Sequence, residues 1–301
     1  MAVTEGFVPF HGFRTWYKIV GEPGEELPLL VINGGPGCPH DYMTDLEALD
    51  RTVIFYDQLG CGRSDHPDDP ALWVMDTFVQ EVAAVRSALG LERLHLLGHS
   101  FGAQVALEYL LTRPVGLASL TLAGPLASAA LYESEARRLE HSLPPDARAA
   151  IARDEEGATM AFYQRWLCRL DPWPDHLIRS FTHLNHDVYG IMWGEEWDVT
   201  GNLRDWDVTP RLGELDLPVL ITSGRHDLTT PAVVRPLADG IPGAEWILFE
   251  QSSHVPSAEE PDHYREVLTA FLAKVEASAL PNDGVAADVV PDGTGREQCG
   301  G

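Results

Sequence analysis

The sequence places one serine in a setting that could make it a nucleophile. Ser100 is the centre of residues 98–102 (GHSFG), which follow the apolar run 94–97 (LHLL) and lead into the helix-like segment 101–111. A tight turn from a strand into a helix lifts a serine above a sheet, and flanking glycines let the chain pack closely around it. The pattern therefore predicts a nucleophilic serine; a glycine-rich turn with an incidental serine is the alternative.

Two further residues could activate that serine. A hydroxyl is a poor nucleophile until an imidazole removes its proton, and the imidazole needs a carboxylate that fixes its tautomer. Asp227 follows the apolar run 218–222, and His254 follows the run 246–249, so both lie just beyond predicted strands. Functional side chains of open sheets gather at that edge. We predict Ser100, Asp227 and His254 as a catalytic triad in the chain order serine, acid, histidine.

Other histidines and acids offer weaker alternatives. His226 is next to Asp227 and would point away from it on an extended turn, and Asp207 precedes its strand at the wrong end. His183 and His186 have a helical spacing that could suggest a metal site, but no third ligand stands near them in the sequence. We therefore expect neither a metal ion nor a cofactor.

A glycine loop could complete the machinery. Residues 33–37 (NGGPG) directly follow the apolar run 27–32, where a loop can turn a backbone N–H toward the serine. The N–H of Phe101, at the start of the predicted helix, would be the second donor of an oxyanion hole. Gly35 is our first choice for the loop donor and Gly34 the second, and a plain tight turn is the alternative.

Short apolar runs alternate with helix-like segments along most of the chain. Residues 7–20 alternate apolar and polar side chains around a central His-Gly pair, which is typical of a two-stranded hairpin. Runs that are almost purely apolar predict strands buried on both faces, and segments with a period of 3.6 predict helices. The predicted strands are 27–32, 52–56, 94–97, 117–122, 218–222 and 246–249, and the helices include 76–89, 101–111 and 262–275. This alternation predicts a mostly parallel, doubly wound α/β sheet.

The alternation breaks between residues 126 and 207. That stretch has helical patterning, no good strand, and five of the eight tryptophans. The sheet pattern then resumes, so we predict a helical cap at 126–207 inserted into a core formed by 1–125 and 208–277. Residues 278–301 are rich in Gly, Asp and Pro without periodicity, and we predict a disordered tail.

Composition restricts the possible partners. The chain has 301 residues and a formal charge of −25, whereas nucleic acids and anionic membranes require a basic surface. The four cysteines show no CxxC spacing, which favours free, buried thiols in a reducing compartment. No signal peptide and no run long enough for a membrane helix are evident. We expect a cytoplasmic protein whose partner is a small-molecule or short-peptide substrate, and the sequence does not fix its oligomeric state.

Several motifs together resemble one known family. They are NGGPG (33–37), HDY (40–42), YDQLGCGRSD (56–65), GHSFGAQVALEY (98–109), VTGNLRDWD (199–207), GRHD (224–227) and SSHVP (252–256). The resemblance that they carry spans roughly residues 10–275, which leaves out mainly the C-terminal tail. The chain resembles the prolyl aminopeptidases (proline iminopeptidases) among the α/β-hydrolases, with the closest likeness to the tricorn-interacting aminopeptidase and its amino-acid amidase relatives.

This resemblance implies an α/β-hydrolase fold with a helical cap, and it implies the same triad and the same oxyanion donors. Members that cleave peptides hold the substrate's free α-ammonium on carboxylates, and Glu196 matches one of these. Leu228 stands where some relatives have a second such glutamate, and Asn33 replaces the usual histidine of the glycine loop. The segment around Glu196 (MWGEEW) is also one residue shorter than the family pattern.

The leading hypothesis is a serine hydrolase that cleaves a small amide through an acyl-enzyme. Its substrate would be the N-terminal, proline-type residue of a short peptide, or an amino-acid amide. Trp193 and Trp197 flank Glu196 and are expected to line an apolar pocket, while most other cap tryptophans form the cap's own core. Leu228 and the tryptophans favour the alternative: an esterase, thioesterase or pathway-specific hydrolase or cyclase acting on a hydrophobic metabolite. A non-catalytic relative that only binds a ligand is the third hypothesis.

Overall fold

The computed structural model describes residues 2–153 and 157–279. Within them, eight strands form one sheet in the order β1-β2-β4-β3-β5-β6-β9-β10. The pairs β1–β2 and β2–β4 are antiparallel, and all other neighbours are parallel. The strands are β1 (Val3–Phe10), β2 (Phe13–Val20), β3 (Leu29–Ile32), β4 (Val53–Tyr56), β5 (Leu94–His99), β6 (Leu117–Ala123), β9 (Val219–Gly224) and β10 (Glu245–Phe249).

The predicted fold class is confirmed: the sheet is mostly parallel and helices accompany it. β1 and β2 form the hairpin expected near residues 7–20, and each apolar run overlaps a strand of the sheet. The helices outside the insertion are α1 (Met75–Ala88), α2 (Phe101–Leu111), α8 (Pro231–Gly240), α9 (Pro256–Glu259) and α10 (Pro261–Ala279), with 3-10 helices η1 (His40–Ala48), η2 (Pro70–Leu72) and η3 (Thr209–Glu214).

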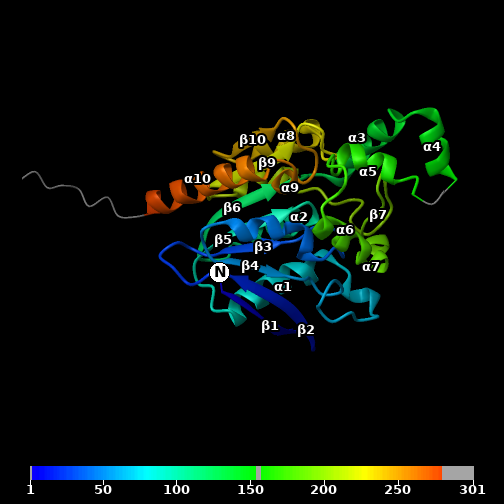
Figure 1. The fold of residues 1–301 in the computed structure, drawn as a ribbon. Coiled ribbons are helices and arrows are strands. Elements are labelled where there is room, and N and C mark those ends of the chain that lie inside the picture. Colours follow the sequence, from blue (N-terminus) through cyan, green and yellow to red (C-terminus); the bar gives the residue numbers. More distant parts are fainter. Residues whose placement is uncertain (1, 154–156, 280–301) are drawn as a thin grey trace, which may run out of the picture.

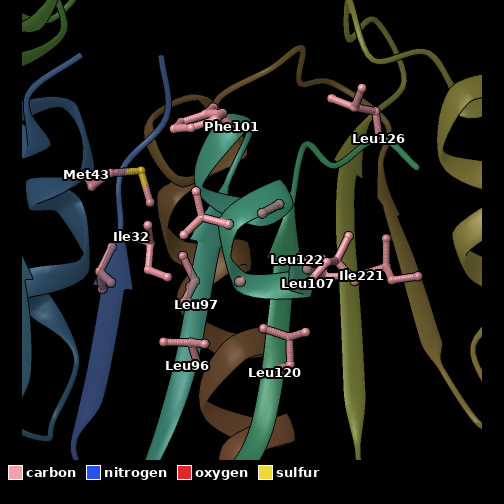
Figure 2. Close-up of a cluster of buried hydrophobic side chains, with 14 of the residues drawn as sticks. Ile32, Met43, Leu96, Leu97, Phe101, Leu107, Leu120, Leu122, Leu126 and Ile221 are labelled. Carbon is pink, nitrogen blue, oxygen red and sulfur yellow. The ribbon is translucent and has the colours of Figure 1, made fainter. Parts of the chain in front are cut away.

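The core of the protein lies between the central strands and the helices on either face. α2 packs on β3, β5 and β6, whereas α10 passes behind the sheet against β6 (Figure 2). Ile32, Leu97, Leu122 and Ile221 come from four neighbouring strands, and none is more than 1% exposed (Figure 2). Burying a side chain of this size contributes about 1.5–3 kcal/mol. The rigid centre of the sheet therefore supports the turns at the ends of these strands.

The insertion lies between β6 and β9 and sits at one end of the sheet (Figure 1). Its elements are α3 (Ala129–His141), α4 (Pro145–Ala152), α5 (Met160–Trp166), α6 (Asp175–Thr182), α7 (His186–Met192), β7 (Gly194–Glu195) and β8 (Asp198–Val199). The two ends of the insertion meet, because Ser128 and Asp207 form a β-bridge. One detail differs from the sequence analysis: β7 and β8 are a short hairpin where no strand was expected, since two-residue strands leave no periodic pattern.

The C-terminal prediction is corrected at its first residues. α10 continues to Ala279, so residues 278–279, which were assigned to the tail, belong to this helix. Its last stretch (KVEASA) contains good helix formers, so the helical conformation continues past the expected boundary. The remainder of the predicted tail, 280–301, lies outside the described residues.

Two further predictions concern membrane spans and cysteines. Among the described residues, no helix combines the length and the apolar character that crossing a bilayer requires. Cys38, Cys61 and Cys168 are free and buried, as the cysteine spacing predicts.

Candidate active site

Ser100 sits on the tight turn between β5 and α2. Its backbone is strained, with φ 54° and ψ −121°, and it precedes the first residue of the helix. The glycines on either side are required by packing: a Cβ on Gly98 would lie 2.2 Å from the carbonyl oxygen of Gly102, and a Cβ on Gly102 would lie 2.2 Å from that of Ile32. The chain thus holds Ser100 in a conformation that few residues adopt, which is common at functional sites.

The two other predicted triad residues are joined by a hydrogen bond. His254 Nδ1 lies 2.7 Å from Asp227 Oδ1, and both side chains are buried. Asp227 Oδ1 also accepts the N–H of Thr229 at 2.7 Å, which fixes the carboxylate. Because Nδ1 donates to the carboxylate, Nε2 is the ring nitrogen left to accept a proton. His254 lines the same pocket as Ser100, so the fold brings all three side chains to one place.

The surroundings of His254 keep its basicity high. Burial favours the neutral ring, but the charge of Asp227 and its hydrogen bond outweigh burial and raise the pKa of His254 above the usual 6.5. Glu196 and Glu259 act in the same direction with smaller effects. A raised pKa suits a general base, because the ring must take the serine proton and keep it until it transfers the proton to the leaving group.

Cap and core together fix the loops that carry Asp227 and His254. The carbonyl of Trp166 accepts the N–H of Leu228 at 2.9 Å, and the carbonyl of Leu167 accepts the N–H of His254 at 3.1 Å. On the core side, Glu259 of α9 accepts the N–H of Ser253 at 2.8 Å. The base is therefore held on a rigid support although it lies on a loop.

Gly124, directly after β6, is a site residue that the sequence analysis missed. Its φ is +53°, and a Cβ there would lie 2.8 Å from His254 Cε1 and 2.9 Å from Nδ1. The imidazole thus occupies the space that any other residue at 124 would need. The sequence carried no signal for it, since the Gly-Pro pair after a strand is typical of an ordinary turn.

The hydrogen bonds of the glycine loop bear on the choice between Gly34 and Gly35 as the loop donor. The N–H of Gly34 donates to the Tyr42 hydroxyl at 2.7 Å, so it is already used. Gly35 lines the pocket beside Ser100, and Phe101 is the first residue of α2, where backbone N–H groups have no partner within the helix. Gly35 and Phe101 therefore remain the predicted oxyanion donors, whereas the N–H of Gly34, the second choice, is occupied by Tyr42.

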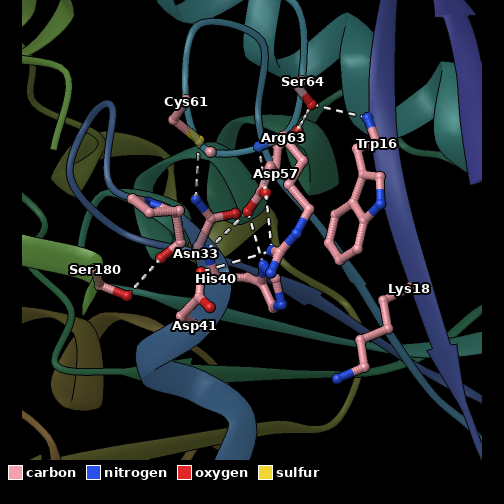
Figure 3. Close-up of polar contacts among 12 residues, drawn as sticks. Trp16, Lys18, Asn33, His40, Asp41, Asp57, Cys61, Arg63, Ser64 and Ser180 are labelled. Atoms are coloured by element: carbon pink, nitrogen blue, oxygen red, sulfur yellow. Dashed lines mark hydrogen bonds and ion pairs between the residues drawn. The ribbon is translucent and has the colours of Figure 1, made fainter. Parts of the chain in front are cut away.

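Buried polar contacts support this loop from below. The side-chain amide of Asn33 donates to the carbonyl of Cys38, which closes the loop on itself. Asp57 Oδ1 accepts both the backbone N–H and the ring Nδ1 of His40, at 2.9 and 2.8 Å (Figure 3). Asp57 Oδ2 accepts the N–H of Arg63 at 2.8 Å. Asn33 therefore has a structural task in place of the histidine that the family pattern leads one to expect.

Glu196 reaches the same pocket from the tip of the β7–β8 hairpin. Three tyrosine hydroxyls donate to its carboxylate: Tyr132 to Oε1, Tyr163 to Oε2 at 3.0 Å, and Tyr189 to Oε2 at 3.1 Å. Burial and the charge of Glu196 raise the pKa of all three phenols well above 10, so each keeps its proton. These tyrosines come from α3, α5 and α7, and the sequence analysis missed them.

The two predicted pocket tryptophans differ. Trp193 lines the pocket and packs edge-on against Tyr132, with ring centroids 5.1 Å apart. Trp197 is not among the residues that line the pocket in the described part of the chain; its ring packs against Phe162, 5.5 Å away, inside the cap. The prediction for Trp197 is therefore corrected, because Glu196 takes the pocket-facing position of the hairpin tip.

The competing residues lie elsewhere. The backbone N–H of His226 donates to Ser252, and Asp207 accepts the N–H of Thr209 at the base of the cap. His183 Nδ1 contacts the carbonyl of Arg179, and His186 starts α7. Of the residues that the structure describes, the pocket lining includes none of these four.

Comparison with known proteins shows the family and the fold. Residues 28–261 match the family model described as alpha/beta hydrolase fold. A proline iminopeptidase of Heyndrickxia coagulans is 39% identical over 286 residues, which cover 90% of this chain and 99% of that protein. The crystal structure of VinJ has a TM-score of 0.87 at 35% identity, covering 90% of this chain and 99% of VinJ.

A second solved structure, the proline iminopeptidase of Mycobacterium smegmatis, has a TM-score of 0.85 at 36% identity and covers 92% of this chain and 100% of its own. In both directions these alignments cover nearly whole chains, including the cap. The chain is therefore a hydrolase, and it belongs to the proline iminopeptidase family of the α/β-hydrolase fold.

Proposed function

We propose that this protein is a serine hydrolase that removes an N-terminal residue, proline above all, from a short peptide or an amino-acid amide. One observation carries the proposal: among the residues that the structure describes, one carboxylate, that of Glu196, lines the pocket that also contains Ser100 and His254. Glu196 is partly buried, and a carboxylate withdrawn from water is stabilised by a paired cation, which the free α-ammonium of a substrate would supply. The proline iminopeptidases named above support proline as the acyl residue.

The chemistry follows from the placement of the triad. Ser100 Oγ attacks the scissile carbonyl while His254 Nε2 takes the hydroxyl proton and Asp227 stabilises the imidazolium. The N–H groups of Gly35 and Phe101 stabilise the oxyanion. When the tetrahedral intermediate collapses, the C–N bond breaks and His254 gives its proton to the leaving amine. Water, deprotonated by the same ring, then attacks the acyl-enzyme and restores the Ser100 hydroxyl.

The three tyrosines prepare Glu196 for an ammonium group. Each phenol has a single O–H, and each donates it to the carboxylate, so the hydroxyls offer only oxygen lone pairs to a ligand. A cluster of one carboxylate and three phenolic oxygens accepts N–H donors and rejects other acceptors. An ammonium group matches it in both charge and donors, whereas an acylated N-terminus has no positive charge and, in proline, no N–H.

The remainder of the pocket is largely apolar. Leu126, Leu177, Trp193, Leu228 and Val255 line it together with Glu196. Such a lining suits a compact ring like that of proline, whose ammonium would face Glu196 while its carbonyl faces Ser100.

One observation favours a second candidate. Leu228 lies in the pocket lining, at the position where some relatives have a second carboxylate, so Glu196 is the only acidic side chain lining the pocket among the described residues. With a single anchor, an ester or thioester of a hydrophobic acyl group is the alternative substrate class.

A substrate comparison tests the proposal. We expect rapid hydrolysis of proline and alanine arylamides. Acylation of the amine should lower kcat/KM by at least about 100-fold, because the substrate then has no ammonium to pair with the carboxylate of Glu196. Equal turnover of blocked and free substrates would refute recognition of the ammonium. Good activity on simple acyl esters combined with none on aminoacyl amides would establish the second candidate.

Labelling by a fluorophosphonate separates both candidates from a protein that only binds ligands. The wild type should be labelled and Ser100→Ala should not. An unlabelled wild type that binds aminoacyl amides without cleaving them would contradict any serine-hydrolase mechanism.

A further inference from the structure

A chain of buried hydrogen bonds connects the glycine loop to the backbone of His254. The N–H of Gly34 donates to Tyr42 Oη at 2.7 Å. Tyr42 Oη lies 2.8 Å from His99 Nδ1, and His99 Nε2 lies 2.8 Å from the carbonyl oxygen of His254. Tyr42 and His99 are each 4% exposed. Neither residue has a role in the proposed mechanism, although both line the pocket.

The direction of every proton in this chain is determined. A carbonyl oxygen can only accept, so His99 Nε2 must carry a hydrogen. Burial and the neighbouring His254 lower the pKa of His99 to about 3, so the ring is neutral and its Nδ1 has a lone pair. Tyr42 must therefore donate its O–H to Nδ1, and its oxygen accepts the N–H of Gly34. Each donor and each acceptor of this chain therefore has one partner, and none of its groups gains or loses a proton near neutral pH.

The same segment is attached to the cap. The N–H of Tyr42 donates to Ser180 Oγ of α6 at 2.9 Å, and Ser180 Oγ donates to the carbonyl of Pro39 at 3.2 Å. Ser180 is fully buried. The backbone of His254 is likewise bound on both sides, to Leu167 of the cap through its N–H and to His99 through its carbonyl.

We propose that Tyr42 and His99 are positioning residues which hold the oxyanion loop and the base of this hydrolase in register. The relay Gly34–Tyr42–His99–His254 joins the two halves of the machinery that must converge on one carbonyl carbon. Because the N–H of Gly34 is bound to Tyr42, the N–H of the neighbouring Gly35 is free to point toward the oxyanion. The space is tight: a Cβ on Gly34 would lie 2.9 Å from Tyr42 Oη and 3.0 Å from Ser100 Cβ.

A small displacement of either half should cost rate rather than binding. Neither Tyr42 nor His99 takes part in the hydrogen bonds that hold Glu196, so the ammonium anchor stays intact when the relay is cut. Misplacing catalytic groups by about 1 Å can cost about 100-fold in rate. The relay therefore predicts a fall in kcat with little change in KM.

Tyr42→Phe tests this with a matched control. Tyr109→Phe also removes a buried tyrosine hydroxyl, one that bonds Arg86 at 2.7 Å on the far part of α2. On a proline arylamide we expect Tyr42→Phe to lower kcat by about 10- to 100-fold with KM within about three-fold, and Tyr109→Phe to affect only thermal stability. The affinity for a prolyl boronic acid, which mimics the tetrahedral intermediate, should weaken in Tyr42→Phe by about the same factor as kcat.

His99 provides the second arm. His99→Gln keeps an N–H that can reach the His254 carbonyl, whereas His99→Leu keeps none, so the glutamine variant should retain more kcat. If the two residues act as one unit, Tyr42→Phe combined with His99→Leu should lose little more kcat than the worse single variant. His99→Gln also keeps the proposal testable if Tyr42→Phe does not fold.

The proposal rests on the hydrolase mechanism but not on the preferred substrate. The same variants are therefore also measured on a simple acyl ester, where the kcat losses should recur even if proline arylamides prove to be poor substrates. The positioning role of Tyr42 and His99 is refuted if kcat of Tyr42→Phe stays within about two-fold of the wild type. It is equally refuted if Tyr109→Phe loses as much kcat, or if the losses in the double variant simply multiply.

Discussion

The N–H of His254 donates to the carbonyl oxygen of Leu167, 3.1 Å away, so the proposed base is bound to the cap as well as to the core. Leu167 immediately follows α5, and the adjacent Trp166 carbonyl accepts the N–H of Leu228 at 2.9 Å. Adjacent carbonyl groups at the end of α5 therefore hold both the loop of the acid and the loop of the base. The cap that forms the substrate pocket also sets the position of the base, which couples substrate recognition to the chemistry.

Gly124→Ala should damage catalysis through the position of the imidazole. The new Cβ would lie 2.8 Å from His254 Cε1, so the ring must move. Gly90→Ala is the matched control, because φ there is +65° but nothing lies within 4 Å of the added Cβ. Both variants should lose about 1 kcal/mol from the positive φ, and only Gly124→Ala should lose about 100-fold or more in kcat. Equal kcat in the two variants would contradict the close approach.

The pH profile should reflect the charges around His254. Its pKa is raised, so the acidic limb of kcat/KM should lie above pH 6.5, and activity should fall as the ring becomes protonated below it. Glu196 contributes to this elevation, together with Asp227 and Glu259, while His99 stays neutral. Glu196→Gln should therefore shift the limb to lower pH. The measurement uses an ester without an amino group, so that substrate anchoring does not interfere; a limb that stays in place would contradict the coupling.

The raised pKa of Glu81 should make the free energy of unfolding fall as the pH rises. Glu81 is buried, accepts the N–H of Leu59 at 2.9 Å, and burial raises its pKa from 4.5 to about 8. Between these values the unfolded chain releases the proton and the folded chain keeps it, so stability that is complete below pH 4.5 is lost up to about pH 8. The free energies of unfolding of the wild type and Glu81→Gln are measured in urea at several pH values. The difference between them should change by up to about 1.4 kcal/mol per pH unit in this range. A constant difference would show that Glu81 does not titrate there.

The sequence was sufficient for features that depend on local pattern. Ser100, Asp227 and His254 each follow an apolar strand, and parallel strands end at one edge, so their convergence could be predicted before any coordinates. The helical insertion was recognisable because the alternation of strands and helices stops there. The short β7–β8 hairpin was not, since two residues cannot show a period.

Other parts of the site depend on contacts between segments far apart in the chain. Tyr132, Tyr163 and Tyr189 come from three helices, and only the packing of the cap brings their hydroxyls to Glu196. The choice between Gly34 and Gly35 depended on the Tyr42 hydroxyl. Trp197 lies next to Glu196 in the sequence, yet it faces the interior of the cap because neighbouring residues at a hairpin tip point in different directions.

The central claim is that Glu196 holds a substrate ammonium above Ser100, and Glu196→Gln tests it most directly. The measurement is the ratio of kcat/KM for a proline arylamide to that for its N-acylated form, in wild type and variant. We predict that the ratio falls by about 100-fold, through loss of activity on the free amine alone, because removing one partner of a charge pair that the bound substrate encloses costs about 2–5 kcal/mol. An unchanged ratio, with the variant folded and labelled by a fluorophosphonate, would contradict the account.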